Sequence, residues 1–286
     1  MSINADGVIG GYFEDSTSYR AFIRTPEGSF TVYDVQNDTR AYGLSDTGYT
    51  TGTTEDGVFH GFVRDASGAV AIFDAPKATY TIGLSVSNSG AVAGWYKNPK
   101  GRELGFIRQT DGTIVSIEPP NAKSTRALGI NTEGVVTGYY FASRRSDKAH
   151  GFLRFPDGTF TSFDCPHSRS TLAQAINDDG AVTGYCYDNR NSLVDGFVRA
   201  AAGTITLFNM LNSKATYAFS IAGDGSVAGD NGGISFVRNP TGEIDTFRIP
   251  KSLGTYAYST NGSGVVVGTS YDHDGHNRGF IRRKDP

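Results

Sequence analysis

Cysteine, methionine and tryptophan are scarce in this sequence of 286 residues, which has two, two and one of them respectively. Two cysteines cannot form the dense disulfide framework that stabilises many small secreted domains. Cys165 and Cys186 lie near the ends of expected strands in adjacent repeats, so one bridge between them is conceivable. We nevertheless expect two unpaired, half-buried thiols, and the cellular compartment cannot be inferred from them.

Long apolar runs and an excess of positive charge are also missing. No segment reaches the length that a membrane-spanning helix needs. The opening residues, MSINADGVIG, have neither a basic nor an apolar stretch, so we expect no signal peptide here. The formal net charge of −3 argues against a nucleic-acid binder of the ordinary basic kind. We therefore expect neither membrane insertion nor a nucleic-acid partner.

Glycine and aromatic residues are abundant, with 37 Gly, 18 Phe and 15 Tyr. Phe and Tyr favour strands, and Gly supplies the backbone conformations that tight turns require. Apolar residues do not recur at the helical period over any useful length. The composition therefore predicts strands joined by tight turns.

A phrase of the sequence recurs, as in VSNSGAVAGWYKNPKGRELGFIR, INTEGVVTGYYFASRRSDKAHGFLR and INDDGAVTGYCYDNRNSLVDGFVR. One landmark is a glycine shortly after the turn, at Gly11, Gly52, Gly94, Gly138, Gly184, Gly229 and Gly268. The other is a phenylalanine, at Phe22, Phe62, Phe106, Phe152, Phe197, Phe236 and Phe280. Successive landmarks are 39 to 46 residues apart. This period indicates one β-propeller blade per repeat.

Each repeat divides into four expected strands, which we call a to d, with tight turns between a and b and between c and d. We predict an all-β fold, a seven-bladed β-propeller with four-stranded antiparallel blades in a single domain, 1–286. The last repeat stops at GFIRRKDP, before any strand d. Blade 7 is then three-stranded, or an upstream strand has been lost, or a second chain pairs there through self-association.

The phrase INDDGAVTGY…DGFVR…GTFTSFDCP resembles the HAF-type extracellular repeats of bacterial proteins over nearly the whole chain. The order of strands and turns is also similar to that of WD40 blades, although the Trp-Asp signature is missing. The resemblance implies a propeller that is extracellular or on the cell surface. It implies no defined reaction and carries over no catalytic residue.

The b–c and d–a loops vary in length and should lie on one face, which we call the long-loop face. Variable loops on a rigid scaffold commonly carry binding residues. The basic residues expected on this face come from blades 3 to 6: Lys97, Lys100, Arg102, Lys123, Arg126, Arg144, Arg145, Lys148, Arg169, Arg190 and Lys214. Such a basic sector would attract anions; the alternative is a solvated rim that keeps the protein soluble.

Aromatic residues follow the strand b glycine and should lie near the same face: Tyr12, Trp95, Tyr96, Tyr139, Tyr140, Tyr185, Tyr187 and Tyr271. Their rings could stack on sugars beside the charged donors, and we count Trp95, Tyr96, Tyr140 and Tyr185 as candidate ligand contacts. The alternative is packing between blades, which we expect for most of them.

Strand c ends in an arginine in every repeat: Arg24, Arg64, Arg108, Arg154, Arg199, Arg238 and Arg282. The adjacent tight turns are rich in Asp and Glu. We expect these arginines to be structural and to bond carboxylates between blades.

Candidates for chemistry are few. His60 and His150 precede Gly-Phe and could act as general acid or base, but no nucleophile stands at a motif-defined distance. Asp272 and Asp274 in YDHDGHN could offer oxygen ligands to calcium, yet the full D-x-D-x-D-G pattern is missing. We expect no cofactor and no metal.

Three functions remain open at this stage. We favour a recognition module that binds an anionic or carbohydrate-like ligand, such as an acidic polysaccharide or a protein surface, on the long-loop face. The alternative is a lyase- or hydrolase-like enzyme at the mouth of the central channel, with His60 or His150 as acid–base and arginines to hold an anion. A structural or protein-interaction module of a surface protein is the third.

Overall fold

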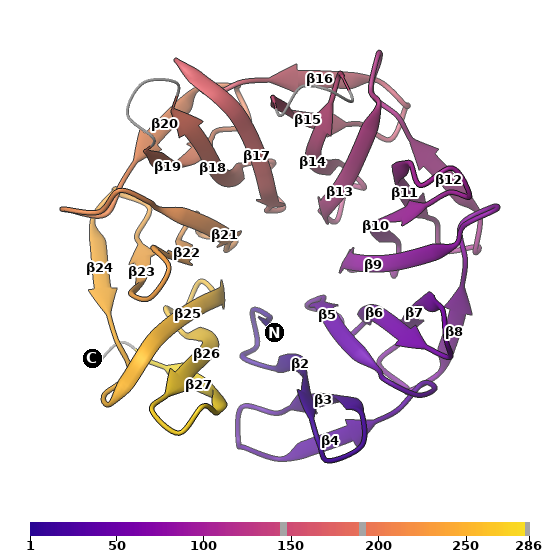
Figure 1. Cartoon of the computed structure of the whole chain (residues 1–286), viewed down its shortest axis with the longest axis horizontal. Helices are drawn as coiled ribbons and strands as arrows, with labels where there is room; N and C mark the ends of the chain where they lie inside the picture. The colour runs from indigo at the N-terminus through magenta and orange to yellow at the C-terminus, as the bar shows by residue number, and fades with distance from the viewer. Residues whose placement is uncertain (144–147, 189–192, 284–286) are drawn as a thin grey trace. The chain divides into compact units, whose positions relative to one another are not determined.

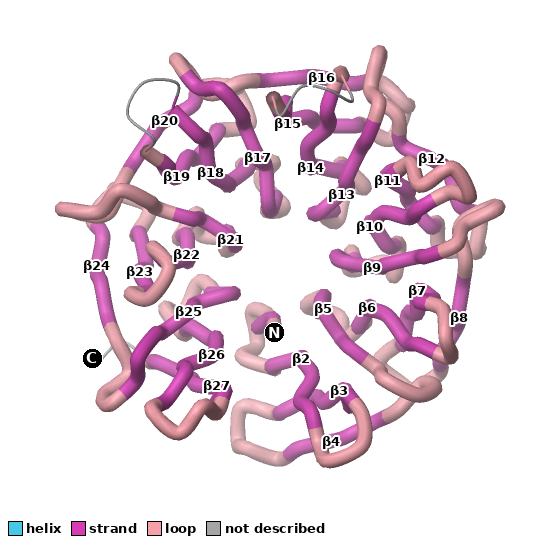
Figure 2. The backbone as a smooth tube through the Cα atoms, in the orientation of Figure 1, coloured by secondary structure: helices cyan, strands magenta, loops and turns pink. Residues whose placement is uncertain are grey.

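The computed structural model describes residues 1–143, 148–188 and 193–283. The chain divides into two compact units, Met1–Ser162 (unit 1) and Phe163–Pro286 (unit 2). Strands and connecting loops make up the described residues throughout (Figure 2). None of these residues belongs to a helix long and apolar enough to cross a membrane.

Unit 1 contains blades 1 to 4, each an antiparallel sheet of four strands that pair in chain order (Figure 1). Blade 1 consists of β1 (Ser2–Ile3), β2 (Ile9–Glu14), β3 (Tyr19–Arg24) and β4 (Phe30–Tyr33). Blade 2 consists of β5 (Arg40–Leu44), β6 (Thr50–Glu55), β7 (Phe59–Arg64) and β8 (Val70–Phe73). Blade 3 consists of β9 (Tyr80–Val86), β10 (Val92–Lys97), β11 (Glu103–Arg108) and β12 (Ile114–Ile117). Blade 4 consists of β13 (Ser124–Ile130), β14 (Val136–Phe141), β15 (Ala149–Arg154) and β16 (Phe160–Phe163), whose last residue belongs to unit 2.

Unit 2 contains blades 5 to 7, and the last has three strands. Blade 5 consists of β17 (Ser168–Ile176), β18 (Val182–Asp188), β19 (Val194–Arg199) and β20 (Ile205–Phe208). Blade 6 consists of β21 (Tyr217–Ile221), β22 (Val227–Asp230), β23 (Ser235–Arg238) and β24 (Ile244–Phe247). Blade 7 consists of β25 (Ser252–Thr260), β26 (Val266–Asp272) and β27 (Asn277–Arg282).

These sheets confirm the predicted all-β, seven-bladed β-propeller with a three-stranded last blade. Whether residues 1–286 form a single domain stays a prediction.

The two repeat landmarks meet in the core of each blade. The strand c phenylalanine is fully buried in five blades, at Phe62, Phe106, Phe152, Phe197 and Phe236. It packs against the strand b glycine of the same blade. In blade 3, a Cβ atom on Gly94 would collide with the carbonyl oxygen of Ile82 and with the Phe106 ring. Only glycine therefore lets strands a and c approach strand b this closely.

A threonine in strand a, or just before it in blade 6, holds the d–a loop against the blade. In blade 6, the Met210 amide donates to Oγ1 of Thr216 at 2.9 Å. The same bond, at the same six-residue separation, recurs at Ala75–Thr81, Cys165–Thr171 and Ile249–Thr255. All four threonines are buried. These four threonine bonds thus hold the d–a loops of the long-loop face in place.

The strand c arginines do not bond carboxylates between blades as predicted. Within the described residues, only Arg282 makes such a salt bridge, to Asp245 at 2.7 Å. The arginines of blades 2, 3, 5, 6 and 7 instead stack on the strand d aromatic ring of the preceding blade: Arg64 on Tyr33, Arg108 on Phe73, Arg199 on Phe163, Arg238 on Phe208 and Arg282 on Phe247. A flat guanidinium suits this contact.

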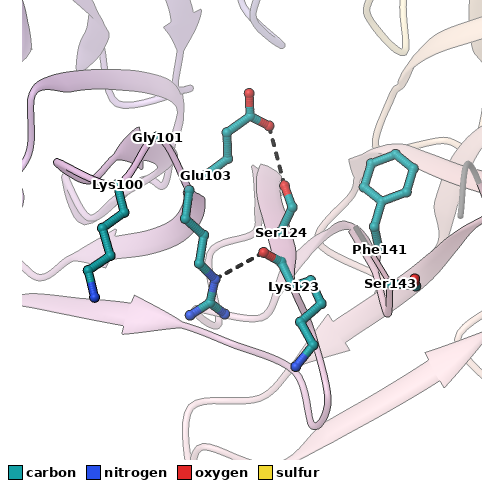
Figure 3. A pocket seen from close by; sticks show the side chains of 8 residues that line it. Lys100, Gly101, Glu103, Lys123, Ser124, Phe141 and Ser143 are labelled. Atoms are coloured by element: carbon teal, nitrogen blue, oxygen red, sulfur yellow. Dashed lines mark hydrogen bonds between the residues drawn. The ribbon is translucent and has the colours of Figure 1, made fainter. Parts of the chain in front are cut away.

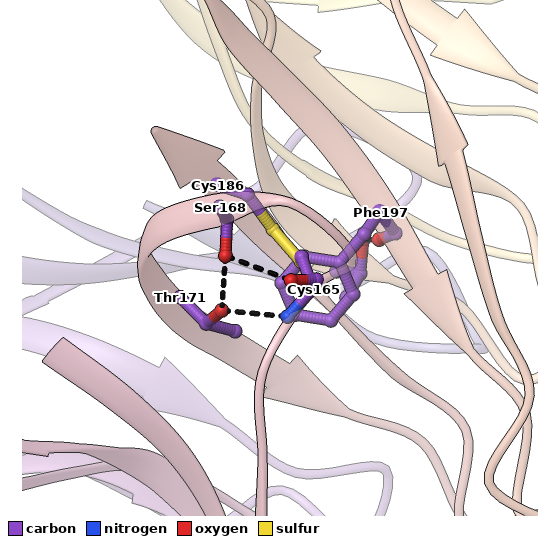
Figure 4. Close-up of a disulfide and its surroundings, with 6 residues drawn as sticks. Cys165, Ser168, Thr171, Cys186 and Phe197 are labelled. Carbon is purple, nitrogen blue, oxygen red and sulfur yellow. Dashed lines mark hydrogen bonds between the residues drawn. A yellow bond between two sulfur atoms is a disulfide. The ribbon is translucent and has the colours of Figure 1, made fainter. Parts of the chain in front are cut away.

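The expectation of two unpaired thiols is wrong, because Cys165 and Cys186 form a disulfide (Figure 4). Their Cα atoms are 6.4 Å apart, within the usual range for a bridge. Strand pairing places Cys186 opposite Thr171, and Oγ1 of Thr171 accepts the amide of Cys165 at 2.8 Å. Thr171 of β17 therefore brings the two cysteines together. The spacing of the cysteines along the sequence does not reveal this.

Candidate ligand-binding cleft

A cleft of about 400 Å³ opens on the long-loop face of unit 1, between blades 3 and 4 (Figure 3). It lies where the β10–β11 loop meets the start of β13 and the end of β14. Its lining residues are Lys100, Gly101, Arg102, Glu103, Lys123, Ser124, Phe141 and Ser143. We call this site the lysine cleft. Three of the predicted ligand contacts, Lys100, Arg102 and Lys123, lie in it together.

The β10–β11 loop is a rigid turn built on Asn98. Oδ1 of Asn98 accepts the amides of Lys100 and Arg102, both at 3.0 Å, and its carbonyl accepts the amide of Gly101 at 2.8 Å. Gly101 has φ of +72°, which favours glycine at this position. The turn therefore presents Lys100 and Arg102 in fixed backbone positions.

The d–a loop before β13 is equally well anchored. The amide of Lys123 donates to the carbonyl of Phe141 at 2.7 Å, and the amide of Ala122 donates to that of Pro119 at 3.0 Å. Asn121 between them adopts a positive φ of 66°. Lys123 is therefore attached to the end of β14, and this bond brings blade 4 residues to the cleft.

Arg102 joins the two loops and is occupied by protein groups. Its Nε donates to the carbonyl of Lys123 at 3.0 Å, and NH2 donates to the carbonyl of Ala122 at 2.9 Å. The same NH2 forms a salt bridge of 2.6 Å with Glu118. Arg102 thus stabilises the wall of the cleft, and its charge is neutralised there.

Arg126 is also paired within the protein. Its Nε and NH2 each donate to the carboxylate of Glu103 at 2.8 Å, and its guanidinium lies 4.7 Å from the centre of the Trp95 ring. The hydrogen bond from Arg126 lowers the pKa of Glu103, and the reciprocal bond raises that of Arg126. Trp95 packs on Tyr80 as well, with ring centres 5.4 Å apart. Arg126 and Trp95 therefore support the cleft through Glu103, which lines it.

Lys100 and Lys123 differ from these arginines. Both are exposed, and no hydrogen bond or salt bridge of either ammonium group is found among the residues that the structure describes. Figure 3 shows the two side chains extending from the loop and from the start of β13 in the same general direction. The lysine cleft thus carries two positive charges that its walls do not neutralise.

The remaining predicted ligand contacts do not share this site. Tyr96 and Tyr140 are buried, with hydroxyls bonded to Ser116 at 2.8 Å and to Ser162 at 3.1 Å. Both rings belong to hydrophobic clusters that combine residues of two adjacent blades, which agrees with the alternative for the aromatic residues, packing between blades. Tyr185 packs edge-on to Tyr217 in unit 2. Lys97 at the end of β10 and Lys148 do not line the cleft, and Arg144, Arg145 and Arg190 lie outside the described residues.

The candidate acid–base residues are held by neighbours. His60 bonds Asp74 through Nδ1 at 2.8 Å and Asp56 through Nε2 at 3.0 Å. Burial alone would lower the pKa of His60, but the bonds to the two carboxylates outweigh it and raise the pKa. His150 stacks on Tyr140 at 5.3 Å. Both ring nitrogens of His60 are therefore occupied.

Asp272 and Asp274 lie with His276 in the β26–β27 turn, where their ligating atoms come within 4.8 Å of one another. Asp272 there accepts the amides of Asp274 and His276, both at 3.0 Å, and a bond of 2.7 Å from Arg278. The hydrogen bond from Arg278 is the main cause that lowers the pKa of Asp272 to about 2. These bonds explain why the three side chains lie close together: Asp272 holds the hairpin turn in place.

The sequence did not predict the other five cleft residues, Gly101, Glu103, Ser124, Phe141 and Ser143. They belong to strand ends or follow them, and nothing in their spacing distinguishes them from packing residues. The useful signal would have been their place on the long-loop face beside the basic residues.

No protein-family model matches the sequence, and no curated protein does. Solved propellers do match the fold. A virginiamycin B lyase from Staphylococcus aureus is 12% identical, with a TM-score of 0.60 over 91% of this chain and 92% of its own. The propeller domain of the Trilobed protease from Pyrococcus furiosus is 11% identical, with a TM-score of 0.63 over 100% and 98%. The BP39L lectin from Burkholderia pseudomallei is 10% identical, with a TM-score of 0.56 over 98% and 93%.

At these identities the likeness establishes the fold class alone. The protein is a seven-bladed β-propeller, and its neighbours include both lyases and a lectin. Its function must therefore be argued from its own residues.

Proposed function

We propose that this chain is a ligand-recognition propeller that binds an anionic, carbohydrate-like ligand in the lysine cleft. The observation that carries the proposal is the pair of exposed ammonium groups, Lys100 and Lys123, in a cleft whose lining arginine, Arg102, is already paired with Glu118. An acidic polysaccharide carries carboxylates at intervals along its chain, and these could pair with the two ammonium groups. Ionic contacts of this kind weaken as salt rises.

Two further cleft residues suit a sugar. Phe141 offers an aromatic ring that is only partly buried, and aromatic faces stack on the apolar faces of sugar rings. Ser124 adds a hydroxyl that donates to Glu103 at 3.4 Å, a long bond that a ligand could replace. The cleft thus combines charge, a ring and a hydroxyl, as small binding sites commonly do.

The test is a binding measurement with alginate, a polyuronate, and with uncharged dextran, at low and high salt. We expect saturable alginate binding that weakens as salt rises, and no comparable binding of dextran. The double substitution Lys100→Ala with Lys123→Ala should weaken alginate binding about ten-fold, since each exposed ion pair contributes on the order of 0.5–1 kcal/mol. Lys251→Ala, an exposed lysine of unit 2 outside the predicted basic sector, is the matched control.

Equal alginate binding by the wild type and the double variant would refute the lysine cleft as the site. Binding of dextran as tight as that of alginate would refute the anionic ligand.

Recognition is preferred over catalysis because His60, one of the two candidate acid–base residues, has both ring nitrogens bonded to carboxylates. A general acid or base must exchange a proton with substrate, and both nitrogens of His60 are bonded to carboxylates. A pH-dependent turnover that is abolished by His60→Ala or His150→Ala would support the enzyme instead.

We also propose that the protein works outside the cytoplasm, as the resemblance to HAF-type extracellular repeats implies. The Cys165–Cys186 disulfide supports this location, because such bonds persist in oxidising compartments. Cell fractionation that finds the native protein only in the cytoplasm, with both thiols free, would contradict it.

A further inference from the structure

The last sheet of unit 2 is one strand short. Blades 5 and 6 each end in an outer strand that pairs with strand c, whereas blade 7 ends at β27. Among the described residues, no strand pairs with the outer edge of β27. The unpaired amides and carbonyls of such an edge are a template for another extended chain.

Complete blades follow a size rule where strands c and d pair. A small residue of strand c stands opposite a large one of strand d: Ala21–Tyr33, Gly61–Phe73, Gly105–Ile117, Gly196–Phe208 and Ser235–Phe247. The large side chain covers the small residue. A Cβ atom on Gly61 would lie 2.5 Å from the Phe73 ring, and one on Gly196 would lie 2.6 Å from Phe208.

Gly279 holds this position in blade 7, opposite Thr269 of β26. It is exposed, whereas Gly61, Gly105 and Gly196 are buried. The place that an aromatic side chain fills in the neighbouring blades is therefore open at Gly279.

In blades 1 and 2 a charged pair accompanies this size pattern, whereas blades 3 and 6 have the apolar residues Leu104 and Ile234 at the same strand c position. The residue before the small one pairs with the residue after the large one: Arg20 with Asp34 at 2.7 Å and His60 with Asp74 at 2.8 Å. In blade 5 the polarity is reversed, and Asn209 donates to Asp195 at 3.2 Å. In β27 this position is Arg278, whose side chain is 65% exposed and which bonds Asp272 of its own hairpin. Arg20 and His60 also contact an acid of their own b–c loop, Asp15 and Asp56, as Arg278 contacts Asp272. By comparison, the partner that Arg278 lacks among the described residues is the acid of strand d.

We propose that the β27 edge binds an extended segment of a partner polypeptide, with an aromatic residue opposite Gly279 followed by Asp or Glu opposite Arg278. The partner completes blade 7 as strand d completes the other blades. Three strands d of this chain end in the same aromatic–acid pair, at Tyr33-Asp34, Phe73-Asp74 and Phe163-Asp164. The surface lies in unit 2, so the proposal is independent of the lysine cleft.

Charge argues against a second copy as the occupant. The edge carries Arg278, and Arg283 follows β27. Two such edges in antiparallel pairing would bring like charges together, which disfavours the pair. The strands d of this chain are already paired within their own blades.

The test uses the full chain and a fluorescent peptide of the sequence GTFTSFD, which is residues 158–164 of this protein. Fluorescence anisotropy should show saturable binding. The protein variant Gly279→Val should bind at least about ten-fold more weakly, because its side chain fills the space for the ring. Since Gly279 lies in extended backbone, a β-branched residue suits the strand itself.

A charge exchange makes the test specific. Arg278→Glu should weaken binding of the peptide, and a peptide with Lys in place of its final Asp should bind that variant and not the wild type. Arg248→Glu, an exposed charge after β24, is the matched control and should leave binding unchanged.

Several outcomes would overturn the proposal. One is the absence of saturable binding at peptide concentrations on the order of 1 mM. Another is equal binding of the peptide by the wild type and Gly279→Val. A dimer in analytical ultracentrifugation that Gly279→Val dissociates would make a second copy the occupant. Slow hydrogen exchange of the β27 outer-edge amides in the protein alone would show that a segment of its own chain covers the edge.

Discussion

At the scale of single residues, the partners of a charge decide its role. Arg102 and Arg126 stand among the basic residues of the long-loop face, but both are used by Glu118, Glu103 and loop carbonyls. Lys100 and Lys123 come from the same stretch of sequence, but their ammonium groups have no such partners among the described residues. Composition cannot distinguish these two groups, because the distinction depends on which carboxylates the fold brings near.

Burial, and not an ion pair, perturbs the carboxyl group of Asp230 in unit 2. Asp230 ends β22, is only 4% exposed, and burial raises its pKa to about 6. The amide of Gly232 donates to its Oδ1 at 2.7 Å, which only partly offsets the cost of burying the charge.

This group makes stability depend on pH. Because its folded pKa of about 6 lies above the ordinary aspartate value of 3.8, the folded state binds the proton more tightly than the unfolded state does. The contribution of Asp230 to stability is therefore greatest below about pH 4, falls as the pH rises to about 6, and is constant above. Asp230→Asn keeps the acceptor for Gly232 and removes the charge.

We predict that Asp230→Asn gains stability relative to the wild type between pH 4 and pH 8, by up to about 3 kcal/mol. Urea unfolding at the two pH values measures this difference. Asp179→Asn, in an exposed turn of the same unit, is the control. A difference between Asp230→Asn and the wild type that does not change with pH would contradict the burial of an ionised carboxylate.

At the scale of elements, each strand c is tied to the blade before it through its terminal arginine. In unit 2, the Arg238 guanidinium lies 5.2 Å from the centre of the Phe208 ring, and its NH1 donates to the carbonyl of Asn239 at 3.2 Å. Burial lowers the pKa of Arg238, which is consistent with a guanidinium packed between strands. The contact joins blade 6 to blade 5.

We predict that Arg238→Ala lowers the free energy of unfolding by about 1–2 kcal/mol, through lost stacking and lost packing of the aliphatic stem. Arg248→Ala removes an exposed arginine of the same blade and should have little effect. Chemical denaturation of both variants provides the comparison. Equal stabilities would mean that the stacked arginine contributes nothing beyond its charge.

At the scale of the whole molecule, the seven repeats become seven sheets, grouped in two compact units. The disulfide belongs to unit 2 alone, where it ties the start of blade 5 to its second strand. Such a link stabilises chiefly by restricting the unfolded chain. Its effect should therefore be local to the unit that contains it.

We predict that Cys165→Ser with Cys186→Ser, or reduction of the wild type, destabilises unit 2 by roughly 2–4 kcal/mol. Hydrogen exchange resolved along the chain should show faster exchange in residues 163–286 and a smaller change in residues 1–162. Uniform acceleration over both units would show that they unfold as one body. No change would mean that the bridge does not restrain the native protein.

The sequence by itself determined the class of fold and the number of blades. These depend on local, repeated signals: the turn residues, the strand b glycine and the strand c phenylalanine recur in every blade, so each copy supports the others. The long-loop face followed from the same connectivity.

Only the tertiary structure decided which residues act together. The Thr171 bond that brings Cys165 to Cys186, the pairing of Arg126 with Glu103, and the meeting of Lys100 with Lys123 all join residues that are distant along the chain. Such contacts depend on register and on the packing of one blade against the next. The repeat determines the strands and turns of each blade. The differences between blades determine which charged side chains are left without a partner.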